Sequence, residues 1–241
     1  MKVLVACEYS GIVRDAFEDA GWNAWSCDLL PTESEQTKQA GKHIQGDVLR
    51  ILNKNRSEFN DWEDCVKLGV PCNFDLLIGH PPCTYLSFAY TGKERYSIAR
   101  LQEKIKAYQF FLDLWGAPIE HICLENPMGY IHTGLLPCSQ IVEPYYFGDN
   151  YKKRTCLWLK NLPKLEYVKI DNLFEYGTMV TPEYRMISKK IKSKPLPAMF
   201  DRCGGKDRSR FHKGIAVAMA KQWTNYIENK KQKTKIKTNK I

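Results

Sequence analysis

Apolar residues follow two patterns along the first half of the chain. Short runs rich in β-branched and aromatic residues predict five strands, at residues 2–6, 22–27, 43–47, 74–78 and 121–124. Helical spacing predicts helices between several of them, at residues 11–20, 48–52 and 97–115. Strands that alternate with helices form a mostly parallel sheet joined by crossover helices. The chain is therefore expected to be an α/β protein.

The stretch 97–115 has the longest helical periodicity. Its apolar residues recur every three or four positions, at Ile98, Leu101, Ile105, Tyr108, Phe111, Leu112 and Trp115. This spacing is typical of an amphipathic helix whose apolar side packs against a sheet. Two further strands, at 140–142 and 155–159, are expected at the far edge of the sheet, and a final helix from 214 is expected to pack back on it.

Composition divides the chain into four parts. Residues 1–160 form the predicted core, and residues 206–229 are expected to form the closing helix. Between them, residues 161–205 carry prolines at 163, 182, 195 and 197 among many lysines, which indicates a small irregular basic insertion. The lysine-rich end, 230–241, is predicted to be a disordered tail, with a phosphate-binding arm as the alternative.

Charge and cysteine content indicate the kind of partner and the cell compartment to expect. The formal net charge is +9, and a basic stretch from Arg185 to Lys213 adds to that of the tail, so a polyanionic partner is expected. No apolar stretch approaches the roughly 20 residues of a membrane span. The first residues enter a strand without the layout of a signal peptide, so the prediction is a cytoplasmic protein with no membrane partner. Nine cysteines without CxxC pairs favour reduced thiols over disulfides or a metal site.

One cysteine follows a predicted strand in an unusual context. The segment Gly79-His80-Pro81-Pro82-Cys83-Thr84-Tyr85 comes directly after the strand at 74–78. A rigid Pro-Pro turn would hold Cys83 at the carboxyl edge of the sheet, where ligands of open α/β sheets bind. Cys83 is therefore a candidate nucleophile, although a lone cysteine is more often a small buried hydrophobe.

Two later segments supply an acid and a cation. Glu125 follows the strand at 121–124, and Arg154 precedes the strand at 155–159. Glu125 is expected beside Cys83, with a pKa raised by partial burial. Arg154 is expected to place a cation near the base, or near the Cys83 sulfur where it would lower the pKa of the thiol, with Lys152 as a second candidate. The alternatives are a surface carboxylate and a solvent-facing arginine at the sheet edge.

Taken in order, Pro-Pro-Cys, then Glu-Asn after a strand, then a basic cluster before a strand, the series resembles the cytosine 5-methyltransferase family. The likeness covers about residues 2–160 and the Gly214-Ile215-Ala216-Val217-Ala218 segment, and it is nearest to short methylase-like chains of phages and prophages. It implies a Rossmann-like S-adenosylmethionine-dependent methyltransferase sheet with Cys83 as nucleophile and Glu125 on the cytosine. A thiolate that adds to carbon 6 activates the 5-position, aided by a proton or hydrogen bond at N3. The target cytosine of DNA would be flipped out, because carbon 6 cannot be reached inside a stacked duplex.

The methyl donor, S-adenosylmethionine, would lie over the carboxyl ends of the first three strands. The predicted donor site takes residues from the turn after the first strand and from the ends of later strands: Glu8, Ser10, Gly11, Asp28, Asp47, Val48 and Pro81. Asp28 is placed to accept hydrogen bonds from ribose hydroxyls. Asp47 is placed to meet the adenine amino group, with Val48 against the ring. Either aspartate could instead cap a helix.

Departures from the family pattern leave other functions open. The first glycine-rich motif is altered to Val5-Ala6-Cys7-Glu8-Tyr9-Ser10-Gly11, and Thr84 stands where the family has glutamine. Only about 50 residues separate the strand containing Trp158 from the last helix, too few for the usual target-recognition domain, so a partner protein could supply sequence specificity. The alternatives are an RNA cytosine methyltransferase, a non-catalytic nucleic-acid-binding relative, and a pyrimidine-modifying enzyme with a different donor.

Overall fold

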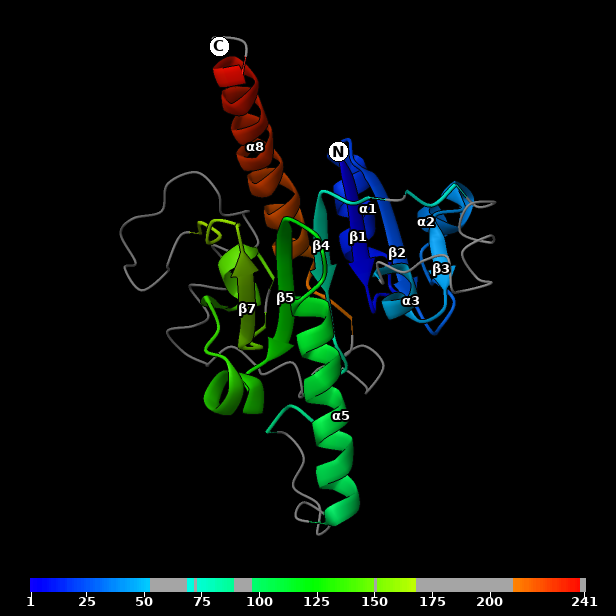
Figure 1. Ribbon diagram of the computed structural model, residues 1–241, viewed down its shortest axis with the longest axis vertical. Coiled ribbons are helices and arrows are strands. Elements are labelled where there is room, and N and C mark those ends of the chain that lie inside the picture. The colour runs from blue at the N-terminus through cyan, green and yellow to red at the C-terminus, as the bar shows by residue number, and fades with distance from the viewer. Residues whose placement is uncertain (53–68, 72, 89–96, 150, 168–209, 239–241) are drawn as a thin grey trace.

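A seven-stranded sheet organises the part of the chain that the structure, a computed structural model, describes: residues 1–52, 69–71, 73–88, 97–149, 151–167 and 210–238 (Figure 1). The strands are β1 (Lys2–Ala6), β2 (Asn23–Asp28), β3 (His43–Gln45), β4 (Leu76–Gly79), β5 (His121–Pro127), β6 (Gln140–Val142) and β7 (Thr155–Lys160). Their order is β3-β2-β1-β4-β5-β7-β6. The first five run parallel, and β7 is antiparallel to both of its neighbours. This arrangement confirms the predicted α/β fold class with a mostly parallel sheet.

Helices cover both faces of the sheet. They are α1 (Ile12–Asp19), α2 (Glu35–Ala40), α3 (Val48–Leu52), α5 (Ile98–Trp115) and α8 (Lys213–Thr238), with a π-helical turn η3 (Ile131–Leu135) and a 3-10 turn η4 (Pro144–Phe147). Helix α2 falls in a segment that the apolar pattern left as loop, because it is short and almost entirely polar. Its first turn is capped by Ser34, whose hydroxyl accepts a hydrogen bond from the Thr37 N–H at 3.1 Å.

Strand residues alternate between two hydrophobic cores, one on each face. Val3 and Val5 of β1 belong to the core formed with α1 and α8, which includes Trp223. Leu4 and Ala6 belong to the core on the other face, formed with α3 and the end of α5. Successive side chains of a strand point to opposite faces, and each face of this sheet is covered. The strands are therefore continuous apolar runs in the sequence.

Helix α5 differs from its prediction. Only its last turns reach the core, where Phe111 packs edge-on against Trp158 with ring centroids 5.1 Å apart. Three residues of the predicted core-facing side are exposed by more than half: Ile98 at 78%, Leu101 at 56% and Ile105 at 58%. Figure 1 shows why, since the first half of α5 extends beyond the sheet. Periodicity identified the helix but could not tell how far the sheet beneath it reaches.

Helix α8 also differs, because it continues to Thr238 where the sequence predicted a disordered tail from 230. Residues 214–238 contain lysine, glutamine and alanine but no proline and only one glycine, at their start, so nothing stops the helix. Lys231 pairs with Asp75 at 2.7 Å, at the amino end of β4. The end of α8 therefore lies at the edge of the sheet opposite to the carboxyl ends (Figure 1). Most of the predicted insertion, 161–205, lies outside the described residues.

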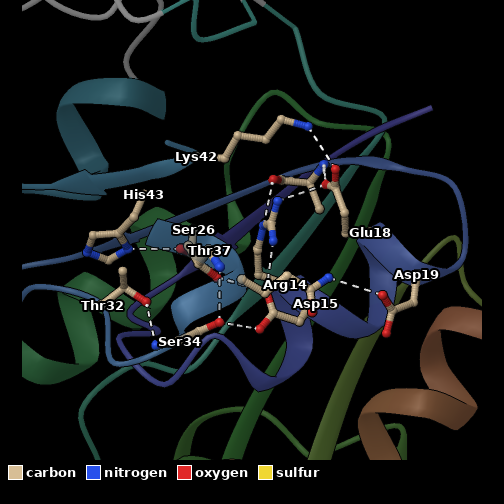
Figure 2. A network of polar contacts seen from close by, with 12 residues as sticks. Arg14, Asp15, Glu18, Asp19, Ser26, Thr32, Ser34, Thr37, Lys42 and His43 are labelled. Carbon is tan, nitrogen blue, oxygen red and sulfur yellow. Dashed lines mark hydrogen bonds and ion pairs between the residues drawn. The ribbon is translucent and has the colours of Figure 1, made fainter. Parts of the chain in front are cut away.

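A buried arginine organises the packing of α1 against β2 and α2 (Figure 2). Arg14 is fully buried, and its guanidinium donates to the Ala24 carbonyl at 3.1 Å and to Asp15 Oδ1 at 2.8 Å, and pairs with Glu18 at 2.9 Å. Asp15 in turn accepts hydrogen bonds from the hydroxyls of Ser34 and Thr37. One carboxylate therefore joins α1 to the N-cap and first turns of α2. None of the described helices is long and apolar enough to cross a membrane.

Candidate active site

The Pro-Pro turn after β4 lies beside the end of β5. Gly79 is the register partner of Leu124, so the next residues on each strand, His80 and Glu125, meet across the sheet edge. His80 Nδ1 lies 3.1 Å from Glu125 Oε2. Asn126 Nδ2 donates to the Pro81 carbonyl at 2.7 Å. The segments that carry Cys83 and Glu125 are therefore held together, as the sequence predicted for these two strand ends.

Cys83 itself is exposed at the start of a tight turn. Its carbonyl accepts from the N–H groups of Leu86 and Ser87 at 3.0 and 2.9 Å. The turn rests on the chain after β5, where the Tyr130 N–H donates to the Leu86 carbonyl at 2.8 Å. Ser87 and Gly129 form a β-bridge at this contact. The position of the cysteine thus depends on the close approach of two backbones.

Gly129→Ala should disturb this contact. A Cβ at Gly129 would overlap the Leu86 carbonyl oxygen, so the Cys83 turn must shift. We expect a loss of about 1–3 kcal/mol in the free energy of unfolding, the usual cost of overpacking, together with slower reaction of Cys83. Urea denaturation and a rate measurement check this. Gly134→Ala is the control, because a Cβ there would meet open space; equal losses in both variants would count against the contact.

Glu125 is buried, and the pKa of its carboxyl is shifted in the opposite direction to the sequence prediction. Burial raises the pKa of its carboxyl, but the hydrogen bond and charge of His80, followed by Lys153 and His212, outweigh burial, so the pKa lies below its ordinary value. The expected upward shift was wrong because the sequence did not show His80 as its partner. An ionised carboxylate only accepts hydrogen bonds, so His80 Nδ1 donates to it. Glu125 Oε1 is buried without a hydrogen-bond partner among the described residues.

The thiol of Cys83 is not activated in the way the sequence suggested. Partial desolvation raises its pKa, the Glu125 carboxylate raises it further, and Lys153 lowers it in part. Arg154 is not the cation that acts on this thiol: its side chain is 64% exposed and lies 3.7 Å from Glu143. Lys153, and not Arg154, lines a small cavity together with Glu125.

Lys153→Gln should therefore move the reactivity of Cys83 to higher pH. The thiolate is the reactive form, and removing a cation that stabilises it raises the thiol pKa. We expect the pH profile of Cys83 alkylation by iodoacetamide, read by peptide mass spectrometry, to shift upward by about one unit or less, as for a partly exposed pair. Arg154→Gln is the matched control and should leave the profile in place. A shift in the control but not in Lys153→Gln would restore the original assignment.

A cavity of about 340 Å³ opens at the carboxyl ends of β1, β2 and β3. It is lined on one side by Asp28 and Asp47, with Val48, Pro82 and Phe110 supplying apolar surface. Asp28, Asp47 and Val48 are three of the residues predicted for the methyl donor. Asp47 Oδ1 also accepts from the Leu49 N–H at 3.0 Å, so it caps α3 as well, the alternative that the sequence left open.

The remaining predicted donor residues lie elsewhere. Glu8 is buried and accepts hydrogen bonds from the N–H groups of Val13 and Arg14 at the start of α1, and from Ser10 Oγ. Glu8 and Ser10 line a second, smaller cavity with His80, Glu125 and Lys153. Gly11 is the N-cap of α1, with φ of 75°. Gly11 and Pro81 line neither cavity, and Pro82 takes the place expected for Pro81.

The turn after β1 begins with Cys7 rather than with a glycine. Cys7 has φ of 59°, the left-handed region that favours glycine, and its N–H donates to the Cys27 carbonyl at 2.7 Å. Cys7 lines both cavities, and burial, followed by the charges of Asp28 and Asp47, raises the pKa of its thiol to about 12. The thiol is therefore neutral, and it packs as a small hydrophobe between the two cavities.

Three of the cavity-lining residues that sequence reasoning missed are His80, Lys153 and Phe110. His80 was quoted within its motif but given no role, although the register of two adjacent parallel strands would have placed it beside Glu125. Lys153 was passed over between Lys152 and Arg154. Phe110 lies on α5, which was interpreted as core packing alone. Most of the basic stretch from Arg185 to Lys213 lies outside the described residues, so its predicted contact with phosphates stays a prediction.

Comparison with known proteins assigns no family to this chain. No family model and no curated protein matches the chain. Among solved structures, it is similar to a protein described as a candidate DNA modification methyltransferase encoded within an E. coli prophage, with 15% identity and a TM-score of 0.41 over 66% of this chain. It is also similar to the S. pombe Dnmt2 methyltransferase, with 15% identity and a TM-score of 0.42 over 77% of this chain. The chain spans 46% and 58% of these two proteins, respectively, and similarity this low assigns no activity or substrate.

Proposed function

We propose that this protein transfers a methyl group from S-adenosylmethionine to the 5-position of cytosine in DNA, through a covalent adduct between Cys83 and carbon 6. One observation carries the proposal. The 340 Å³ cavity at the strand ends reaches Pro82, next to Cys83, while the adjacent smaller cavity contains Glu125. Cys83 lines neither cavity, but Cys7 lines both, and Pro82 places the cysteine next to the first, so a donor bound there would lie beside Cys83.

The larger cavity has the size and chemistry of an adenosine site. Small-molecule sites are usually of about 300–1,000 Å³ and combine apolar walls with a few polar groups. Here two carboxylates, Asp28 and Asp47, stand at the polar side, and Val48, Pro82 and Phe110 provide surfaces against which a flat ring can pack. Asp28 would hold the ribose hydroxyls, and Asp47 the adenine amino group. S-adenosylmethionine, when bound, supplies an electrophilic methyl group.

The reaction at the base relies on Cys83 and Glu125. The Cys83 thiolate adds to carbon 6 of the flipped cytosine, which makes carbon 5 nucleophilic. Glu125 Oε1 is free to accept a hydrogen bond from the exocyclic amino group. The proton needed at N3 would be shared along the hydrogen bond between Glu125 and His80. Because the pKa of the Cys83 thiol is raised in the protein alone, the thiolate forms only in a small fraction of molecules until the base is bound.

A trapping experiment tests this function. The full chain is incubated with S-adenosylmethionine and DNA duplexes that contain 5-fluorocytosine, whose fluorine cannot be eliminated, and the products are examined by intact-protein mass spectrometry. We expect a covalent protein–DNA adduct that is absent in Cys83→Ala. The matched control is Cys123→Ala, which changes a buried cysteine in the core between the sheet and α8 and should leave the adduct in place.

The alternatives predict different outcomes. An adduct with 5-fluorocytosine in RNA but none in DNA would identify the substrate as RNA. DNA binding without an adduct, and unchanged affinity in Cys83→Ala, would favour a non-catalytic nucleic-acid-binding protein. An adduct that forms equally well without S-adenosylmethionine and carries no methyl group would favour a different donor. Sequence specificity from a partner protein would appear as an adduct on every sequence tested when this chain is alone.

A further inference from the structure

Three side chains beside β7 bring metal-ligating atoms together. They are His132 in η3, Cys138 in the segment before β6, and Cys156 in β7. One ligand atom from each lies within 4.8 Å of the other two. Cys156 is buried and the other two are half-buried. Cys156 comes 18 positions after Cys138, so the two cysteines form no CxxC pair, which is why the spacing of cysteines gave no sign of a site.

The surroundings of the cluster are rich in sulfur. The sulfur atoms of Cys156 and Met128 are 4.0 Å apart. His132 Nδ1 accepts the backbone N–H of Cys138 at 3.0 Å, so this nitrogen carries a lone pair rather than a proton. A cation bound through Nδ1 would take this lone pair in place of the Cys138 N–H, so binding would exchange that hydrogen bond for a metal–nitrogen bond. No aspartate or glutamate belongs to the cluster among the described residues.

This donor set selects the class of ion. Two thiolates and an imidazole suit Zn²⁺, whereas Mg²⁺ and Ca²⁺ take oxygen ligands. Tetrahedral zinc, with bonds of about 2.3 Å to sulfur and about 2.0 Å to nitrogen, requires ligand atoms about 3.3–3.8 Å apart. The observed separations of up to 4.8 Å need only small side-chain rotations to reach this. A disulfide between the two cysteines would leave His132 without a part in the cluster.

We propose that His132, Cys138 and Cys156 bind one Zn²⁺ ion, with a solvent molecule as the fourth ligand. The ion would tie η3 and the segment before β6 to β7, the strand next to the edge of the sheet. The same connection, between β5 and β6, supports the Cys83 turn through Gly129 and Tyr130. Zinc would therefore stabilise the platform on which Cys83 rests. The zinc site does not depend on the proposed methyl transfer, and it can be tested independently of that activity.

Metal analysis of the full chain tests the site. Protein purified under reducing conditions is expected to contain, or to take up after chelation, about one Zn²⁺ per chain. Co²⁺ in its place should give the visible bands of a tetrahedral ion and a near-ultraviolet thiolate charge-transfer band. Cys138→Ser and His132→Gln should each weaken binding at least about tenfold, as removal of a ligand does. Cys83→Ser is the matched control and should bind Zn²⁺ like the unmodified chain.

A second measurement connects the ion to stability. Zn²⁺ should raise the Tm of the unmodified chain, because a ligand that binds only the folded state stabilises it, and it should not raise that of Cys138→Ser. If the variants fail to fold, the Co²⁺ spectrum of the unmodified chain decides the question alone. Absence of metal binding, equal affinity in Cys138→Ser, a Co²⁺ spectrum without thiolate charge transfer, or a Cys138–Cys156 disulfide in the purified protein would each overturn the proposal.

Discussion

Glu125→Gln is expected to lower the rate of methyl transfer by about 10²–10⁴-fold, the usual contribution of a positioned acid or base. Glutamine has the same shape and can still accept the hydrogen bond from His80 through its amide oxygen. It cannot carry the negative charge or share the proton that N3 requires. The change should therefore act on the chemical step and leave DNA affinity close to that of the unmodified chain. Single-turnover methylation, with donor and enzyme in excess over duplex, measures this step directly.

The control for this variant is Glu120→Gln. Glu120 is an exposed carboxylate at the amino end of β5, where it pairs with Lys230 at 2.8 Å. Glu120→Gln removes the same charge as Glu125→Gln, but at the opposite edge of the sheet, so it should leave the rate of methyl transfer unaltered. Equal rates in Glu125→Gln and Glu120→Gln would show that the buried carboxylate has no part in the reaction. A rate loss matched by an equal loss of DNA affinity would make Glu125 a binding residue only.

Asp15→Ala is expected to cost about 3 kcal/mol in the free energy of unfolding, the lower end of the range for removing one partner from a buried ion pair. Arg14 is fully buried, and the change removes its hydrogen bond to Asp15 Oδ1 while Glu18 still balances part of its charge. The hydroxyls of Ser34 and Thr37 lose their acceptor as well (Figure 2). Urea denaturation followed by circular dichroism gives the loss.

Lys38→Ala is the matched control for the buried network. Lys38 pairs with Glu35 at 2.6 Å on the exposed side of α2, and such pairs contribute about 0–1 kcal/mol. The loss in this variant should therefore be small and should shrink with added salt, whereas the loss in Asp15→Ala should persist. Similar losses in both would mean that the Arg14 network is no stronger than a surface pair.

Strand positions were predictable because they depend on local sequence. Residues 2–6, 22–27, 74–78 and 121–124 were identified as strands, and β1, β2, β4 and β5 lie within two residues of those bounds, except that β5 continues to Pro127. A buried parallel strand is a continuous apolar run, whatever its neighbours. Helix α5 was found for a similar reason, but the environment of its first half was not, because exposure depends on what lies beside a helix.

For the site, the sequence predicted which strand ends contribute residues but not how their side chains interact. Cys83, Glu125, Asp28 and Asp47 were selected because each follows a strand, and the carboxyl ends of parallel strands gather at one edge of the sheet. The choice of Arg154 over Lys153, and the direction of the shift in the pKa of Glu125, were wrong. Both depend on distances across the sheet edge. Neighbouring residues there face different ways, so the sequence could not tell which side chain lies near Cys83 or Glu125.

The sequence by itself determined the order of strands and helices, the fold class, and which strand ends bear a thiol, a carboxylate or a possible ribose acceptor. These features follow from local periodicity and from the fixed geometry of parallel sheets. Only the tertiary structure decided that His80 holds Glu125, that Lys153 faces the cysteine, and that His132, Cys138 and Cys156 meet beside β7. Hydrogen bonds, charge interactions and metal ligation act over a few ångströms through space, and the sequence does not contain those distances.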